Sequence, residues 1–198
     1  VHSEFYLARQ KKQEERVCQA LRLAGWSEWY HPELMPTPFH FKREKRINFS
    51  CMDLTDTWCR IDFVICVRGG GFVFLEVDEN QHMFGYGSTL SCDMKRMSKV
   101  MASIAFESLQ GGDLFTIPLI FWLRYNPNAW HMDGVLQNRS KVSREEWLCR
   151  LLSNLEVKTE LTIGYAFYDT VKGCLEVLNN TEYHPQMAKV AIDLTEYV

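Results

Sequence analysis

The sequence predicts an α/β domain in which helices flank a mixed β-sheet. Within residues 60–78, two runs of β-branched and aromatic residues are separated by a glycine cluster, which is typical of a β-hairpin. Apolar residues recur at helical spacing in residues 92–109 and 143–155. The continuous apolar run 116–125 indicates a strand buried on both faces. The predicted element order is α-β-β-β-α-β-α-β.

The first elements of the chain are a helix, a loop and a short strand. Residues 3–24 contain no Gly or Pro, and Gly25 stands where a helix with this apolar spacing would end. Residues 26–41 hold three prolines and several aromatic residues, so we expect a packed loop there. A short strand is predicted at residues 46–51 and a turn at residues 52–57.

Later elements follow from similar patterns. Ser88 or Ser91 is a candidate N-cap for the helix 92–109, and the methionine stripe of that helix is expected in the core. The second amphipathic helix, beginning at Ser143, has two glutamates in its first turn, which favour a helix N-terminus. Residues 162–168 predict a further strand, and the C-terminal segment 186–197 fits either a helix or a strand.

Composition bounds the class of protein. The chain has 198 residues, of which 46% are hydrophobic, and it fits a single globular domain. No apolar run approaches the roughly 20 residues of a membrane span, and the polar N-terminal segment is unlike a secretory signal. The first residue is not Met, so we expect a piece of a longer chain or a processed product. Seven cysteines without a Cys-x-x-Cys pair favour reduced thiols in an intracellular protein, of cytoplasm or nucleus.

Three acidic residues lie within or at the end of the two apolar runs of the predicted hairpin. Asp62 lies inside the first apolar run, and Glu76 and Asp78 end the second. Side chains alternate along a strand, so Glu76 and Asp78 point the same way, and the neighbouring strand brings Asp62 alongside. Like charges side by side on a sheet repel each other, and an unpaired charge inside an apolar run is costly. A hard divalent cation with oxygen ligands is therefore the partner that we expect.

Basic residues gather around this acidic centre although the net charge is −3. They cluster in residues 9–16, 42–46 and 139–150. Each cluster alone fits a solvated face, but three of them beside a metal site suit an approaching phosphate backbone, with Arg46 as a candidate substrate-binding residue. Five tryptophans are candidates for base stacking, although packing is expected for most of them: Trp26, Trp29, Trp122, Trp130 and Trp147.

Four short motifs follow one another along the chain. They are Asp62, then Glu76-Val77-Asp78 with Gln81-His82, then Asp93-x-x-Arg96, then Leu123-Arg124-Tyr125-Asn126. This combination resembles the PD-(D/E)XK restriction-endonuclease-like superfamily, and within it the branch related to very-short-patch-repair endonucleases, which also has similar segments in certain homing endonucleases and giant-virus proteins. The resemblance covers about residues 4–133. It implies a nuclease core in residues 1–135, with residues 136–198 as a C-terminal extension packed on the same domain.

The resemblance also implies a site. By matching position, Asp62 and Glu76 would bind the divalent ion, Mg²⁺ or else Mn²⁺, and the backbone carbonyl of Val77 would complete the site. The lysine usual in the family would stand at position 78, where this chain has Asp78, so Gln81, His82 or Lys95 would orient the water instead. His82 is preferred as general base or leaving-group helper because its pKa lies near neutrality. Asp78 is then a catalytic residue or a further metal ligand.

The predicted helix and the later strand supply supporting residues. Lys95 and Arg96 are expected to bind substrate. Arg96 shares its helix face with Asp93, so it contacts either a phosphate or that carboxylate. Arg124 lies in an apolar strand end and needs a partner, for which Asp93 and Glu76 are the candidates. Asp93 and Arg124 are therefore expected to support the site.

A Mg²⁺-dependent endonuclease that cuts DNA is the leading hypothesis from these residues. One alternative is a catalytically degenerate nuclease-like fold that binds nucleic acid or protein, which the absent lysine at position 78 favours. A second alternative is a nuclease acting on RNA. No membrane partner is expected, and a homodimer is left open.

Overall fold

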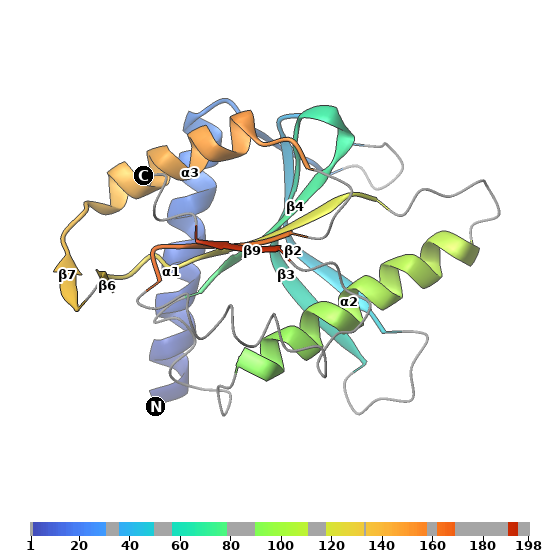
Figure 1. Ribbon diagram of the computed structural model, residues 1–198, viewed down its shortest axis with the longest axis horizontal. Helices are drawn as coiled ribbons and strands as arrows, with labels where there is room; N and C mark the ends of the chain where they lie inside the picture. Colours follow the sequence, from blue (N-terminus) through green and yellow to red (C-terminus); the bar gives the residue numbers. More distant parts are fainter. Residues whose placement is uncertain are drawn as a thin grey trace.

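Helices cover both faces of a seven-stranded sheet in the computed structural model, with α1 and α3 on one face and α2 on the other (Figure 1). The structure describes residues 2–30, 36–49, 57–78, 90–110, 118–132, 134–157, 162–168 and 190–193. Within this part of the chain, the strand order is β1-β2-β3-β4-β5-β8-β9. None of the helices described there is long and apolar enough to cross a membrane.

The helices and strands have the following bounds. The helices are α1 (His2–Leu23), α2 (Leu90–Gln110) and α3 (Lys141–Asn154). The main sheet contains β1 (Ser27–Glu28), β2 (His40–Asn48), β3 (Trp58–Cys66), β4 (Phe72–Val77), β5 (Ile120–Tyr125), β8 (Thr162–Ala166) and β9 (Val190–Asp193). A separate pair consists of β6 (Trp130–Met132) and β7 (Val135–Gln137).

The predicted hairpin is confirmed as β3 and β4. The two strands are antiparallel, and their register runs from Cys66↔Phe72 to Phe63↔Leu75. The connection is a short 3₁₀ segment in which Gly69 has φ of 78°, a backbone conformation that favours glycine.

The sheet is mixed, as the sequence predicts. β2 and β3 pair antiparallel, whereas β4 pairs with β5, β5 with β8, and β8 with β9 in parallel. The carboxyl ends of β4, β5 and β8 therefore meet at one edge, which is where ligands bind in open α/β sheets.

Some predicted boundaries are wrong. The strand predicted at 46–51 is β2, which begins at His40 inside the expected loop, because the strand pairs with β3 at each of its positions except Glu44 in spite of its charged residues. The helix α3 begins at Lys141 rather than Ser143, and the Ser140 hydroxyl caps it by accepting from the Ser143 N–H at 3.1 Å. The ambiguous segment 186–197 contains the strand β9.

Two buried cores lie on either side of the sheet. Val17 and Leu21 of α1 pack with Leu148 of α3 on one side, and Met97 and Val100 of α2 pack on the other. The prediction that the methionine stripe is core is confirmed at Met97. The packing prediction is also confirmed for four tryptophans, which are buried: Trp26, Trp122, Trp130 and Trp147.

Candidate functional site

Asp62 and Glu76 lie at the end of the β3–β4 ladder. The last paired residues are Phe63 and Leu75, so the next positions on the two strands are Asp62 and Glu76. Beyond this point the Val77 N–H donates to Asp62 Oδ2 at 2.8 Å. A side-chain carboxylate thus takes a hydrogen bond that a backbone carbonyl accepts in a regular ladder, directly beyond the last residues that pair between β3 and β4.

The face that β3 presents changes at Asp62. Phe63 packs in the core beneath α1 and α3, whereas Ile61 and Cys59 pack in the core beneath α2. All three would lie on one face of a regular strand. Glu44, the β2 position across from Asp62, has φ of 48°, a value that non-glycine residues rarely adopt. The sheet is therefore distorted at the predicted catalytic acid, a pattern that recurs at functional sites.

Glu76 is buried and paired with an arginine of α2. It is 3% exposed, and its Oε1 accepts from Arg96 Nη2 at 2.6 Å. The same nitrogen donates to the backbone carbonyl of Arg60 at 2.7 Å. Arg96 therefore joins α2 to both β3 and β4, and the negative charge of Glu76 raises the pKa of Arg96.

Asp78 is occupied by contacts within the sheet. It is 1% exposed, and its Oδ2 accepts from Arg124 Nε at 2.5 Å and from the hydroxyl group of Tyr168. Its backbone N–H donates to the Tyr125 carbonyl at 2.8 Å. Arg124 thus pairs with Asp78, a partner that the sequence analysis did not consider. This placement favours a structural role for Asp78 over the catalytic or metal-ligand role expected from the sequence.

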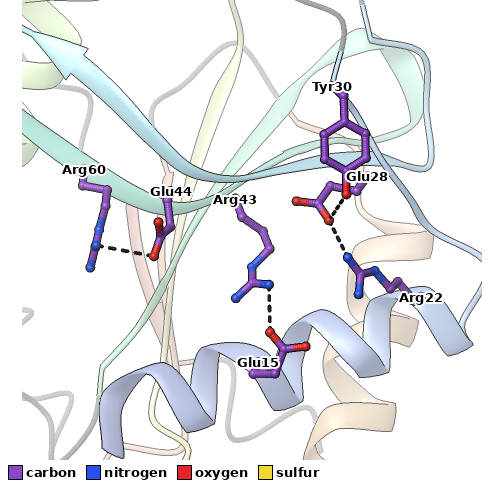
Figure 2. Close-up of polar contacts among 7 residues, drawn as sticks. All are labelled: Glu15, Arg22, Glu28, Tyr30, Arg43, Glu44 and Arg60. Carbon is purple, nitrogen blue, oxygen red and sulfur yellow. Dashed lines mark hydrogen bonds and ion pairs between the residues drawn. The ribbon is translucent and has the colours of Figure 1, made fainter. Parts of the chain in front are cut away.

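Ion pairs fix α1 against the β1–β3 side of the sheet (Figure 2). Arg43 of β2 reaches Glu15 of α1 at 2.8 Å, and Arg22 at the end of α1 reaches Glu28 of β1 at 2.6 Å. These contacts set the rotation of α1, because Glu15 and Arg22 lie nearly two turns apart on the helix. The neighbouring residue Glu14 is thereby turned toward the sheet.

Glu14 adds a further carboxylate to the acidic centre, one that the sequence analysis missed. It is 6% exposed, and its charge raises the pKa of Asp62. Burial raises the pKa of Glu14 itself, with Arg60 opposing this shift. A usable signal was present, because Glu14 shares a helix face with the apolar residues Val17 and Leu21 and is polar where core is expected.

Burial and mutual repulsion shift both principal carboxyl groups toward neutrality. Burial, followed by the charge of Glu14, raises the pKa of Asp62 to about 6, and the Val77 N–H opposes the shift. Burial raises the pKa of Glu76 to about 7; Arg96 opposes this shift, and Asp62 and Asp78 add to it. Both groups therefore titrate near physiological pH, so a cation bound between them would gain affinity as they deprotonate.

The donor set matches a hard divalent cation in type. Asp62 and Glu76 offer carboxylate oxygens, and the Val77 backbone carbonyl is adjacent, a set that suits Mg²⁺ because this ion keeps several of its waters. Within the described residues, however, no group of three or more His, Cys, Asp or Glu side chains is arranged to hold a metal ion. A metal would therefore be held by two carboxylates, backbone and water.

The remaining predicted site residues are placed as follows. Gln81 and His82 lie outside the described residues, as do the side chains of Asp93 and Lys95 in α2. Arg46 lies on the exposed part of β2, paired in register with Arg60. The structure thus gathers Asp62, Glu76, Val77 and Arg96 at one place, with Asp78 and Arg124 beside them.

Comparison with known proteins finds no matching family model, no matching curated protein and no matching solved structure.

The pair of Asp78 and Arg124 provides a test of the structural role. Arg124→Met would leave the Asp78 carboxylate buried without its cation, so we expect the free energy of unfolding to fall by about 3–5 kcal/mol in urea denaturation. The control is Arg22→Met, which removes an exposed ion pair with Glu28 and should lower the free energy of unfolding much less. Equal losses in the two variants would contradict the structural role.

The raised pKa of Asp62 predicts how stability depends on pH. The folded chain binds the carboxyl proton more tightly than the unfolded chain, so the free energy of unfolding should fall as pH rises from about 4 to about 7. Asp62→Asn keeps an acceptor for the Val77 N–H but removes the charge. In EDTA it should be more stable than the native sequence at pH of about 8, by on the order of 1–3 kcal/mol, and the difference should vanish below pH of about 4. An identical pH profile for both proteins would refute this assignment.

Proposed function

We propose that the chain is a divalent-metal-dependent endonuclease domain of the restriction-endonuclease-like type, which hydrolyses phosphodiester bonds in DNA. The observation that carries the proposal is the position of Asp62 and Glu76. They occupy the positions next to the last paired residues of β3 and β4, Glu76 is buried and Asp62 half-buried, and burial raises their pKa values to about 6 and about 7. A fold that keeps two such carboxyl groups together gains most when a cation binds between them.

Each ligand is held in place by a neighbour. The Val77 N–H fixes Asp62 Oδ2, and Arg96 fixes Glu76 Oε1, so the second oxygen of each carboxylate is the one available to a cation. The cation, when bound, polarises the phosphate and lowers the pKa of an attached water. The Val77 carbonyl is the third donor in this proposal.

Arg96 supplies the positive charge that position 78 lacks. It is adjacent to Glu76, and its side chain is 30% exposed, so part of its guanidinium faces solvent. A guanidinium is well suited to hydrogen-bond a phosphate oxygen. It stays protonated and does not accept a proton, so His82 or Gln81 keeps the proposed role of orienting or deprotonating the water.

A binding module without catalysis is the second candidate. Glu76 Oε1 is already paired with Arg96 at 2.6 Å, and position 78 carries an acid bound to Arg124. If these internal pairs satisfy the acidic centre, the fold needs no metal and recognises nucleic acid or protein by its surface alone.

Cleavage of supercoiled plasmid tests the enzymatic proposal. We expect nicking in Mg²⁺ or Mn²⁺, and a loss of rate of at least about 100-fold in Asp62→Asn and in Glu76→Gln, because each removes charge from the metal site. Glu15→Gln is the matched control, since this acid lies on α1 and pairs with Arg43 instead. Cleavage that survives both site substitutions would discard the mechanism, and a labelled RNA in parallel reactions separates the two substrates.

Calorimetric titration with Mn²⁺ separates the enzyme from the binding module. Metal ligands must be deprotonated, so we expect binding to release protons and to tighten as pH rises through about 6 to 7. Glu76→Gln should weaken binding at every pH. If no heat of Mn²⁺ binding is found while DNA is still bound, the module is the correct function.

A further inference from the structure

The face of the β2–β3 ribbon that leads to Asp62 carries an exposed tryptophan and two arginines. Cys59 and Ile61 pack beneath α2, so the exposed residues Trp58 and Arg60 share the opposite face, which leads along β3 to Asp62, where the strand changes its face. The register pairs Trp58 with Asn48 and Arg60 with Arg46, which places these β2 residues on the same face. Trp58 and Asp62 are four residues apart, or about 13 Å along the strand.

Trp58 and Arg46 form a stacked pair on this face. The Arg46 guanidinium lies 4.6 Å from the centroid of the Trp58 ring, and its Nε donates to Asn48 Oδ1 at 3.0 Å. Trp58 is 47% exposed, whereas Trp122 and Trp130 are 1% and 4% exposed. Within the described residues, Arg46 has no carboxylate partner at ion-pair distance, so its charge is directed at solvent. An open aromatic ring beside an uncompensated cation is the chemistry that binds a nucleobase and its phosphate.

Arg60 connects this pair to the acidic centre. Its contact with Glu44 is 3.5 Å long, and both side chains are more than two-fifths exposed (Figure 2). Such exposed pairs add little stability, so a phosphate can take the place of Glu44. The positive side chains of Arg46 and Arg60 therefore lie on the part of the ribbon that precedes Asp62 and Glu76.

We propose that Arg46, Trp58 and Arg60 form a track that binds an unpaired DNA strand and leads it to Asp62. Bases inside a duplex are stacked on each other and present no free face, so the base that stacks on Trp58 belongs to a single-stranded segment. At about 3.4 Å per stacked step, this base lies about four nucleotides from the bond next to Asp62. The inference rests on the proposed nuclease function and adds its substrate class: DNA with a single-stranded segment beside the cleaved bond.

Fluorescence anisotropy with the whole chain tests the track without catalysis. The probe is a labelled oligothymidylate of about 20 nucleotides in EDTA, compared with a duplex and an RNA of equal length. Trp58→Ala should raise the Kd for the single strand about 5- to 100-fold, while Trp58→Phe keeps an aromatic face and should stay within about 3-fold. Arg46→Gln should lower the slope of log K against log salt concentration by about 0.7.

Two control variants lie outside the track. Tyr30→Ala removes an aromatic ring that is 67% exposed beside Glu28, and Arg68→Gln removes an exposed charge in the connection between β3 and β4. Both should leave the Kd for the single strand unchanged. An unchanged Kd in Trp58→Ala, an equal loss for the duplex, or tighter binding of the RNA would overturn the proposal.

The same assay separates this proposal from the nuclease function. Asp62→Asn and Glu76→Gln should not weaken the binding of the single strand, because they only remove negative charge. Trp58-dependent binding without any cleavage would refute the catalytic proposal and leave the track standing. If the protein cleaves DNA but Trp58→Ala does not change the Kd for the single strand, the track is refuted and the nuclease function is not.

Discussion

Burial of negative charge at the end of the β3–β4 ladder is the constraint on which the rest of the structure depends. Glu14, Asp62, Glu76 and Asp78 come from three elements, and the electrostatic influence of each on another raises a carboxyl pKa. Neighbouring charges of one sign in a low-dielectric setting are tolerated only when cations or hydrogen-bond donors face them. The cations that face them are Arg96 of α2 and Arg124 of β5.

The structure divides these carboxylates into two kinds. Asp78 is enclosed, with Arg124 and Tyr168 bound to it, and it joins the carboxyl ends of β4, β5 and the segment after β8. Asp62 and Glu76 each have one oxygen held, by Val77 and Arg96 respectively. The enclosed acid stabilises the sheet edge, and the half-occupied pair beside it is what we propose to bind metal. In this proposal, stability is given up at the pair for the sake of metal binding.

Much of the fold was predictable from local pattern, but the site was predictable only in part. The hairpin, α1, α2 and β5 follow from periodicity and glycine positions within short windows. The partners of Asp78 could not be predicted in this way. Arg124 and Tyr168 lie 46 and 90 residues further along the chain, and only the order of the strands brings them to Asp78. Glu14 was missed because α1 was interpreted by its apolar residues alone, and Trp58 because its exposure depends on which elements cover that face of β3.

Anomalous X-ray scattering from crystals soaked in Mn²⁺ tests the central claim most directly. If the carboxyl pair exists to hold a cation, one strong peak should lie between Asp62 and Glu76, at about 2.0–2.2 Å from an oxygen of each, as expected for octahedral oxygen coordination. Glu76 should then share its charge between the ion and Arg96. Density that shows no ion there, with the contact between Glu76 and Arg96 intact, would contradict the account.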